Sequence, residues 1–336
     1  MQKLVLICCF LIASCQVFAQ QDAKQLYESA KILMRQGEYE TATTVLLKAV
    51  KQDSTNIDMQ KDLAYLYLLQ NNPVLSAQIS RPLIDRADAD AQCFQMLGMA
   101  YKAAANYSEC ATLYKYGILK FPHAGVLYNE YGELLAMQQQ LEQAIVQWEK
   151  GIEQDPNHSN NYYNASMYYA LNRKWLRVAL YGEYFINLES FTARTETIKG
   201  KLLNAYQALL QPGALQQFGN GNSFEKAFAA AICQNNNAGK PVNINLENLL
   251  QARLVFVTNW IAEKATQLPL RLVDHLMQLQ KEGIWDAYQQ WVFGAALNPA
   301  AFQQWQSVHA KEVQAFQQFQ QGRVFKVPTQ QYYTGN

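Results

Sequence analysis

The chain has 336 residues, of which 50% are apolar, and this is ample for packed domains and excludes a disordered protein. Its 28 Lys and Arg residues are balanced by 27 Asp and Glu residues. No general electrostatic attraction to nucleic acid or to an anionic membrane follows from this balance, so a nucleic-acid partner is not expected.

The first nineteen residues have the pattern of a secretory signal peptide. Lys3 supplies a short positive region, residues 4–14 form an apolar run, and Ala19 is the small residue that a signal peptidase needs. We therefore expect residues 1–19 to be removed on export to the periplasm or outer envelope of a bacterium. The run is too short to cross a bilayer core of about 30 Å, so no transmembrane span is expected.

A second interpretation of the same segment changes the expected location. Residues 12–15, Ile-Ala-Ser-Cys, resemble a bacterial lipobox, whose cysteine is lipidated and becomes the first mature residue. The Ile and Ser depart from the residues usual in that motif, so soluble export is preferred. A lipoprotein anchored through Cys15 is the alternative.

Two columns of residues recur every 34 positions in the next part of the chain, a small residue followed three positions later by a large one. A period of this length is typical of stacked helix-turn-helix units, each of which needs its neighbours to bury its apolar face. The small residues let helices approach closely, and the large ones fill the space beside them. The small column is Ala30, Ala64, Gly98, Gly132 and Ser166, and the large column is Leu33, Tyr67, Tyr101, Leu135 and Tyr169.

These units resemble the tetratricopeptide repeat (TPR) family. The unit that begins at Gly125 carries the family's packing residues, namely Tyr128, Tyr131, Gly132, Leu135, Ala144, Trp148 and Ile152, and the closing turn Asp155-Pro156-Asn157. The units near residues 23 and 91 match it, whereas those near residues 57 and 159 are degenerate. In the degenerate units Ala77 and Ala179 stand one residue late, which suggests a one-residue insertion in each turn.

The resemblance implies an all-α fold, a right-handed helical-hairpin solenoid of five repeats over residues 23–192. In that family the first helix of each repeat lines a concave face that binds a partner. The resemblance assigns this role to Tyr27, Lys31, Arg35, Lys61, Tyr65, Leu68, Gln95, Met99, Lys102, Asn129, Glu133, Met137, Tyr163 and Met167.

The assigned side chains form a mixed groove, basic near its amino-terminal end and aromatic and Met-containing toward its carboxy-terminal end. A protein or peptide segment with an acidic end and an apolar end would suit this groove. A specialised form of the fold grips a terminal carboxylate with Lys and Asn. The first unit offers Tyr27 and Lys31 instead, so that mode is not expected.

Beyond about residue 193 the repeat pattern fades, and residues 193–336 are expected to form a helical carboxy-terminal domain. Helices are expected over residues 197–210, 245–264, 270–281 and 285–296, with a flexible loop at 235–243. A final helix, capped by Asn298, is expected to run from Pro299 past Phe319. The ending is too aromatic for a disordered tail, and we expect it to lie against these helices or across the groove.

Three cysteines lie beyond the leader, Cys93, Cys110 and Cys233. Cys93 and Cys110 share one repeat but stand at different heights of its two antiparallel helices, so that a bridge would strain the Cα separation limit of about 7 Å. Three unpaired, buried thiols are therefore predicted.

Known catalytic and metal-binding motifs are missing from the sequence. Gly239-Lys240 lacks the earlier glycine of a phosphate-binding loop, and there is no H-E-x-x-H, C-x-x-C or G-x-S-x-G. We expect an exported, non-catalytic scaffold or adaptor for envelope protein complexes, with no cofactor and no metal. A glycan-binding envelope protein and a helical enzyme with its site in residues 193–336 remain as alternatives.

Overall fold

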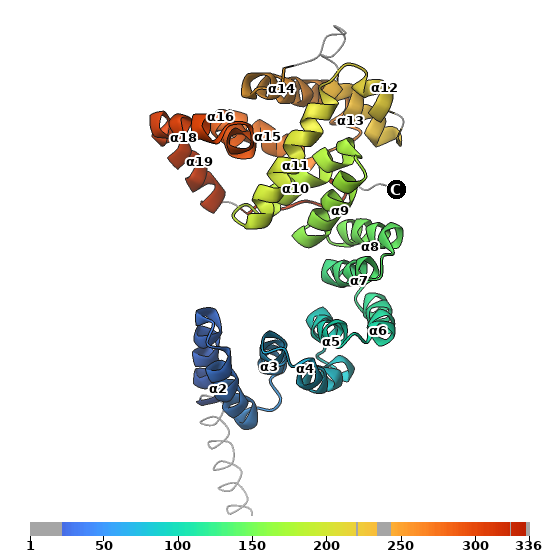
Figure 1. Ribbon diagram of the computed structural model, residues 1–336, viewed down its shortest axis with the longest axis vertical. Helices are drawn as coiled ribbons and strands as arrows, with labels where there is room; N and C mark the ends of the chain where they lie inside the picture. The colour runs from blue at the N-terminus through green and yellow to red at the C-terminus, as the bar shows by residue number, and fades with distance from the viewer. Residues whose placement is uncertain (1–21, 220, 234–242, 323, 334–336) are drawn as a thin grey trace, which may run out of the picture. The chain divides into compact units, whose positions relative to one another are not determined.

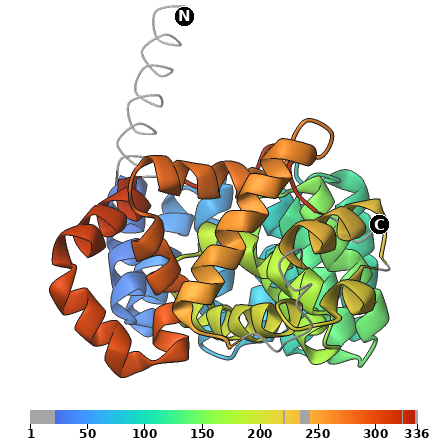
Figure 2. The ribbon, with the colours of Figure 1, turned by 90° about the horizontal axis from the view of Figure 1, so that it is seen from above.

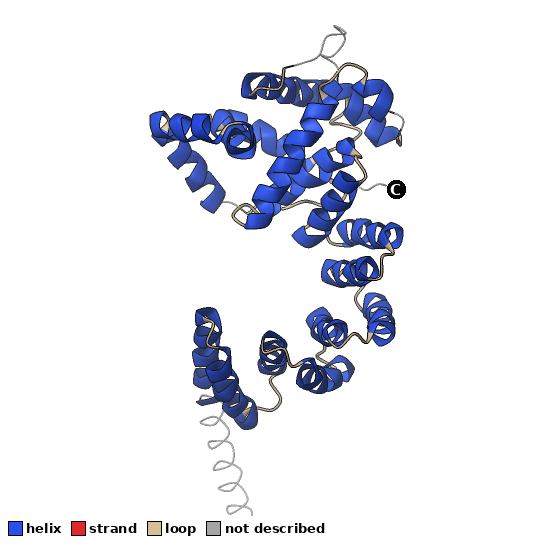
Figure 3. Ribbon diagram, viewed as in Figure 1, coloured by secondary structure: helices blue, strands red, loops and turns tan. Residues whose placement is uncertain are grey.

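The computed structural model describes residues 22–219, 221–233, 243–322 and 324–333. The leader, the lipobox and most of the expected loop lie outside these residues. The described residues form helices and turns without a strand (Figure 3), which confirms the all-α prediction. None of the helices within these ranges has the length and apolar character needed to cross a membrane. The chain divides into two compact units, one ending at Gln138 and the other beginning at Gln139.

Unit 1 consists of helical hairpins. Residues 22–36 form its first helix, and the later helices are α2 (Tyr39–Gln52), α3 (Ile57–Leu69), α4 (Pro73–Ser80) with a 3-10 turn η1 (Arg81–Asp85), α5 (Ala91–Ala103), α6 (Tyr107–Lys120) and α7 (Gly125–Met137). The first helices α3, α5 and α7 lie on one side of the unit and the second helices α4 and α6 on the other (Figure 1). Consecutive first helices contact one another, α3 with α5 and α5 with α7.

The turns within the hairpins repeat with the period of the sequence. A residue with positive φ follows each first helix, and these residues are Gly37, Asn71, Ala105, Gln139 and Arg173, spaced by 34. At Ala105 two main-chain bonds close the helix, from Ala105 N to Lys102 O and from Asn106 N to Tyr101 O. The same pair of bonds recurs at Gly37, Asn71 and Arg173. At these four turns the large-column residues Leu33, Tyr67, Tyr101 and Tyr169 therefore also supply the carbonyl that closes the first helix.

This register shows that the expected one-residue insertions are wrong. The second helices begin at Tyr39, Pro73, Tyr107, Leu141 and Trp175, again with a spacing of 34. The fourth residue of each of these second helices is fully buried. These residues are Ala42, Ser76, Cys110, Ala144 and Val178. Ser76 and Val178 occupy the place that alanine fills at residues 42 and 144, so Ala77 and Ala179 are not its equivalents and no insertion is needed.

Unit 2 continues the hairpins and then departs from them. Its helices are α8 (Leu141–Gln154), α9 (Ser159–Leu171), α10 (Trp175–Leu188), α11 (Ala193–Leu209), α12 (Ala214–Phe218), α13 (Ser223–Cys233), α14 (Leu246–Glu263), α15 (Arg271–Lys281), α16 (Trp285–Gln289), a π-helical turn (Gln290–Gly294), α17 (Ala295–Leu297), α18 (Pro299–Val308) and α19 (Ala310–Gly322). The start of α11 at Ala193 keeps the spacing of 34 from Ser159, and Thr192 caps it. Thus α11 is a sixth first helix, and the period ends after it.

The prediction of a single final helix is wrong, because the helix is interrupted at His309. Asn298 caps α18 as predicted, accepting a hydrogen bond from Ala301 N at 3.1 Å. The His309 backbone then leaves the helical region, with φ −110° and ψ 38°, while its ring stacks on Trp305. As a result α18 and α19 form a hairpin at one edge of unit 2, drawn in red in Figures 1 and 2.

The three cysteines are unpaired and buried, as predicted. Burial raises the pKa of the Cys93 and Cys110 thiols to about 11 and that of Cys233 to about 12. They are therefore protonated at neutral pH and fill space as small apolar groups.

Candidate partner-binding surface

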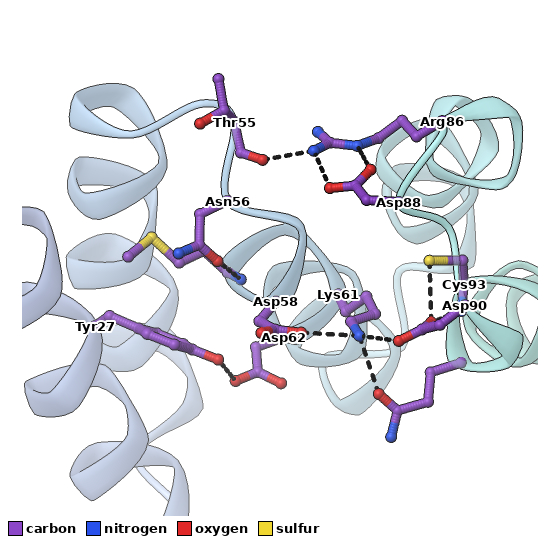
Figure 4. A network of polar contacts seen from close by, with 12 residues as sticks. Tyr27, Thr55, Asn56, Asp58, Lys61, Asp62, Arg86, Asp88, Asp90 and Cys93 are labelled. Atoms are coloured by element: carbon purple, nitrogen blue, oxygen red, sulfur yellow. Dashed lines mark hydrogen bonds and ion pairs between the residues drawn. The ribbon is translucent and has the colours of Figure 1, made fainter. Parts of the chain in front are cut away.

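Several of the assigned polar side chains of unit 1 bind residues of the next first helix or of its N-cap, as Figure 4 shows for Tyr27 and Lys61. Tyr27 OH donates a hydrogen bond of 2.7 Å to Asp62 Oδ2 on α3. Lys61 on α3 reaches the start of α5, where its Nζ donates to Asp90 Oδ2 at 2.7 Å and to Gln92 Oε1 at 3.0 Å. These contacts link three successive hairpins of the unit.

The same arrangement continues from α5 to α7. Gln95 Nε2 donates to Glu130 Oε1 at 2.9 Å, and Lys102 Nζ binds Glu130 and, at 3.3 Å, Glu133 Oε2. Asn129 Nδ2 in turn donates to Glu133 Oε1 at 3.0 Å. We call the contacts from Tyr27 to Glu133 the polar ladder; its members are Tyr27, Lys61, Asp62, Asp90, Gln92, Gln95, Lys102, Asn129, Glu130 and Glu133.

The two ladder lysines keep their charge. Burial by itself would lower the pKa of Lys61, but its hydrogen bonds to Asp58 and Asp90 outweigh burial and raise it. Burial would likewise lower the pKa of Lys102, but the Glu130 and Glu133 carboxylates outweigh burial and raise it. Their charges are therefore compensated inside unit 1, and the expected basic end of the groove is neutralised at these two positions.

Other residues on the first helices of unit 1 remain accessible. Tyr65, Leu69 and Met137 expose 37%, 38% and 52% of their surface, and Met99 is partly buried. Arg35 is exposed, and Lys31 pairs with Glu28 of its own helix at 2.6 Å. We call these residues the first-helix strip; its members are Lys31, Arg35, Tyr65, Leu69, Met99 and Met137.

The strip follows the repeat. Lys31, Tyr65 and Met99 share one repeat position, and Arg35, Leu69 and Met137 share another, four residues later. Equivalent positions of stacked repeats lie side by side, so we expect these side chains to form one continuous surface. The sequence assignment named Leu68 rather than Leu69. Leu69 stands 34 residues after Arg35, so the repeat register could have identified it.

The two assigned residues of unit 2 lie in a different setting. The Tyr163 ring packs against Phe185, with 5.2 Å between ring centroids, and the Arg194 guanidinium lies 4.9 Å from its centroid. Met167 is partly buried. The Tyr163 face is therefore largely used by contacts within unit 2.

Unit 2 also contains a cleft of about 590 Å³, lined by Tyr169, Asn172, Arg173, Lys174, Leu176, Arg177, Gln217, Phe218, Gly221 and Glu225. At its wall Arg177 Nε donates to Glu225 Oε1 at 2.7 Å. Burial would raise the pKa of the Glu225 carboxyl, but its hydrogen bonds with Arg177 and Tyr333 outweigh burial and lower it. Burial and the nearby Glu149 raise the pKa of Tyr169. These groups form a satisfied ion-pair network rather than an acid and base poised near neutral pH.

Together these features define a helical-hairpin repeat protein with the register of the tetratricopeptide repeat, as the sequence predicts. No family model and no curated protein matches the chain. Solved structures are similar to it in fold. PilF of Pseudomonas aeruginosa is 16% identical over 56% of this chain and 86% of its own, with a TM-score of 0.46.

Two further solved structures have similarly low sequence identities and TM-scores. A thermophilic TPR protein of Thermus thermophilus is 13% identical over 55% of this chain and 98% of its own, with a TM-score of 0.46. A tetratricopeptide repeat protein of Parabacteroides merdae is 10% identical over 78% of this chain and 99% of its own, with a TM-score of 0.40. At these identities the similarity concerns the arrangement of helices.

Proposed function

We propose that the protein is a non-catalytic scaffold or adaptor that binds a polypeptide segment on the first-helix strip of unit 1. The proposal is supported by a difference between two sets of residues on the first helices. The polar ladder residues bond to one another, whereas Tyr65, Leu69 and Met137 keep apolar surface exposed at groove positions. Exposed aromatic and methionine side chains are frequent anchors in protein interfaces.

The strip also suggests the chemistry of the partner. Its apolar residues would cover aliphatic or aromatic side chains of the segment, while Lys31 and Arg35 at one end would favour an acidic group. This refines the expected basic groove, because Lys61 and Lys102 are buried in their ion pairs, with 8% and 13% of the side chain exposed, whereas Lys31 keeps 35% exposed beside Glu28. A mixed apolar and acidic segment is thus the preferred ligand.

We further propose that the protein works in a bacterial envelope. Support comes from the sequence of residues 1–19, whose charge, apolar run and closing small residue suit a signal peptide. Cleavage after Ala19 and assembly of envelope complexes are parts of this proposal, as is the lipoprotein alternative at Cys15. Intact-mass measurement of the exported protein would distinguish a chain that begins at residue 20 from a lipidated one that begins at Cys15.

A glycan ligand depends on clustered exposed rings that stack on sugars. On the described first helices of unit 1, Tyr65 is exposed whereas Tyr27 is bonded to Asp62. One exposed ring among the assigned groove positions of unit 1 favours a polypeptide over a glycan on this surface.

The test is crosslinking and affinity purification from the native envelope with a strip variant, Tyr65→Ser, Leu69→Ser and Met137→Ser. A control variant removes exposed apolar residues of the second helices, Val74→Ser, Tyr116→Ser and Leu119→Ser, which expose at least half of their surface. The proposal expects specific protein partners to be lost with the strip variant and kept with the control. Equal recovery with both folded variants would contradict binding at the strip.

A further inference from the structure

The last described segment of the chain, residues 324–333, lies on unit 2 without helix; residues 324–328 are extended, and residues 329–332 form a turn in which Gln331 N donates to Pro328 O at 3.2 Å. Its first side chains alternate as in a strand, with Val324 and Lys326 exposed and Phe325 and Val327 buried to 8% and 2% exposure. Tyr333 at the other end is also buried, with 2% exposed. The segment is therefore seated by three side chains, as expected from the aromatic character of its sequence.

Unit 2 holds the main chain of this segment through side chains. Asn157, in the turn between α8 and α9, accepts from Val327 N at 2.9 Å and donates to Val327 O at 3.1 Å. Arg271 Nε donates to Lys326 O at 2.9 Å, and Tyr184 OH donates to Gln331 O at 2.6 Å. The bonds to Lys326 and Val327 hold extended backbone, the bond to Gln331 O holds the turn that follows, and none of them contacts the side chains of the segment.

Selectivity comes from two apolar sites. The Phe325 ring packs against Tyr184 and His275, with ring centroids 6.2 and 5.2 Å apart, and under the Arg271 guanidinium. The Tyr333 ring packs against Phe224 at 5.1 Å, and its hydroxyl donates to Glu225 Oε1 at 2.7 Å. The surface thus holds an aromatic residue, an aliphatic residue two positions later, and a tyrosine further along.

The surface can remain satisfied when the segment leaves. Glu225 keeps its ion pair with Arg177 at 2.7 Å and its hydrogen bond from Asn222 N at 3.1 Å. An unpaired buried charge would be the main obstacle to release of the segment. Release leaves no such charge here, because Glu225 stays paired with Arg177.

We propose that this surface of unit 2 is a binding site for a segment of a partner protein that is extended at its start and then turns, and that residues 324–333 occupy it until the partner replaces them. The partner segment carries an aromatic-x-aliphatic sequence followed by a tyrosine, the chemistry that the resident segment shows. This site belongs to unit 2 and does not depend on the first-helix strip. The resident segment is covalently tethered, which gives it an effective concentration of the order of millimolar.

Cutting the covalent link between the segment and the rest of unit 2 tests the proposal. A specific protease sequence is inserted after Gly322 in the full-length chain, and a fluorescein-labelled synthetic peptide reproducing residues 324–333 is added before and after cleavage. We expect the peptide, followed by fluorescence anisotropy, to bind the cleaved chain at least tenfold more tightly than the intact chain. The substitution Asn157→Ala in the cleaved chain should weaken binding about tenfold, since two main-chain hydrogen bonds are lost.

Paired peptides test the selectivity. A peptide with Phe325→Ala and Val327→Ala should bind at least tenfold more weakly, because both side chains are buried. The matched peptide with Val324→Ala and Lys326→Ala should bind within twofold of the original, because both side chains are exposed. Equal binding of the two altered peptides would overturn the proposal.

A second measurement uses the intact chain, so that the outcome does not depend on cleavage. Excess unlabelled peptide should accelerate hydrogen exchange of the Val327 amide in the resident segment. Unchanged exchange would show a permanent part of the fold and overturn the proposal, as would loss of helical circular dichroism on cleavage. Dimers formed by exchange of this segment would identify a second copy as the occupant and overturn the assignment to a partner protein.

Discussion

The Arg253 side chain on α14 lies against the Glu183 carboxylate on α10, and both side chains are completely buried. Tyr206 OH donates to Glu183 Oε1 at 2.9 Å and Tyr288 OH to Glu183 Oε2 at 3.2 Å. One carboxylate therefore joins helices α10, α11, α14 and α16. A buried ion pair of this kind contributes to the unique packing of unit 2 only while both partners are present.

Removal of one partner should be strongly destabilising. We expect Arg253→Met to lower the free energy of unfolding by about 3–5 kcal/mol, since Glu183 would be left charged and buried. The matched control is Lys264→Met, which removes a partly exposed pair with Glu263 at 3.8 Å and should cost less than about 1 kcal/mol. Urea unfolding followed by circular dichroism measures both. Similar losses for the two variants would contradict a special role of the buried pair.

The Glu225 carboxyl gives a prediction about pH. Its pKa is lowered in the folded protein, so its contribution to stability is complete above the ordinary value of 4.5 and is lost as the pH falls below it. Glu225→Gln removes this dependence, so the stability difference between wild type and variant should shrink as the pH falls from 7 to 3.

A matched control for that prediction is Glu247→Gln. Glu247, like Glu225, lies in the first turn of a helix, but it is exposed. Its substitution should leave the pH dependence of unfolding almost unchanged. A wild-type to Glu225→Gln difference that stays constant across the pH range would refute the assigned ion pairing.

The buried thiols predict low reactivity. Because burial raises the pKa of Cys93, Cys110 and Cys233 to about 11, 11 and 12, thiolate is scarce at pH 8. We expect the native protein to react with a disulfide reagent at less than about a hundredth of the rate seen in urea. The absorbance of the released thiolate gives both rates. Rapid reaction of any of these three residues in the native state would contradict its burial.

The sequence predicted the features that depend on local spacing. Helix starts at Ile57, Ala91, Gly125 and Ser159 follow from the small and large columns, because each column position meets the same neighbours in every hairpin. The exported location and the assigned binding role are not tested by the structure and stay predictions.

Features that depend on distant partners were not predictable from the repeat pattern. Lys61 and Lys102 have the sequence appearance of free groove cations, yet their partners Asp90 and Glu130 lie on the next first helix. Asn157 matches a closing turn in sequence, and nothing local indicates its contact with Val327, 170 residues away.

The small column itself can be tested at two glycines that share one repeat position, Gly98 on α5 and Gly200 on α11. A Cβ built on Gly98 would lie 2.2 Å from the Tyr114 ring, whereas a Cβ on Gly200 meets nothing within 4 Å. We expect Gly98→Ala to lower the free energy of unfolding by about 1–3 kcal/mol through overpacking. Gly200→Ala should raise it by about 0.5–1 kcal/mol, since alanine has the higher helix propensity.

The opposite signs make this pair informative, because helix propensity alone would make both substitutions stabilising. Thermal and urea unfolding of the two variants provides the measurement. The variant Gly98→Ala with Tyr114→Leu is a further control, since leucine lacks the ring atoms Cζ and Cε1 that lie 2.2 and 2.4 Å from the added carbon, and it should recover part of the loss. Stabilisation by Gly98→Ala would show that α5 and α6 do not need the close approach that this glycine permits.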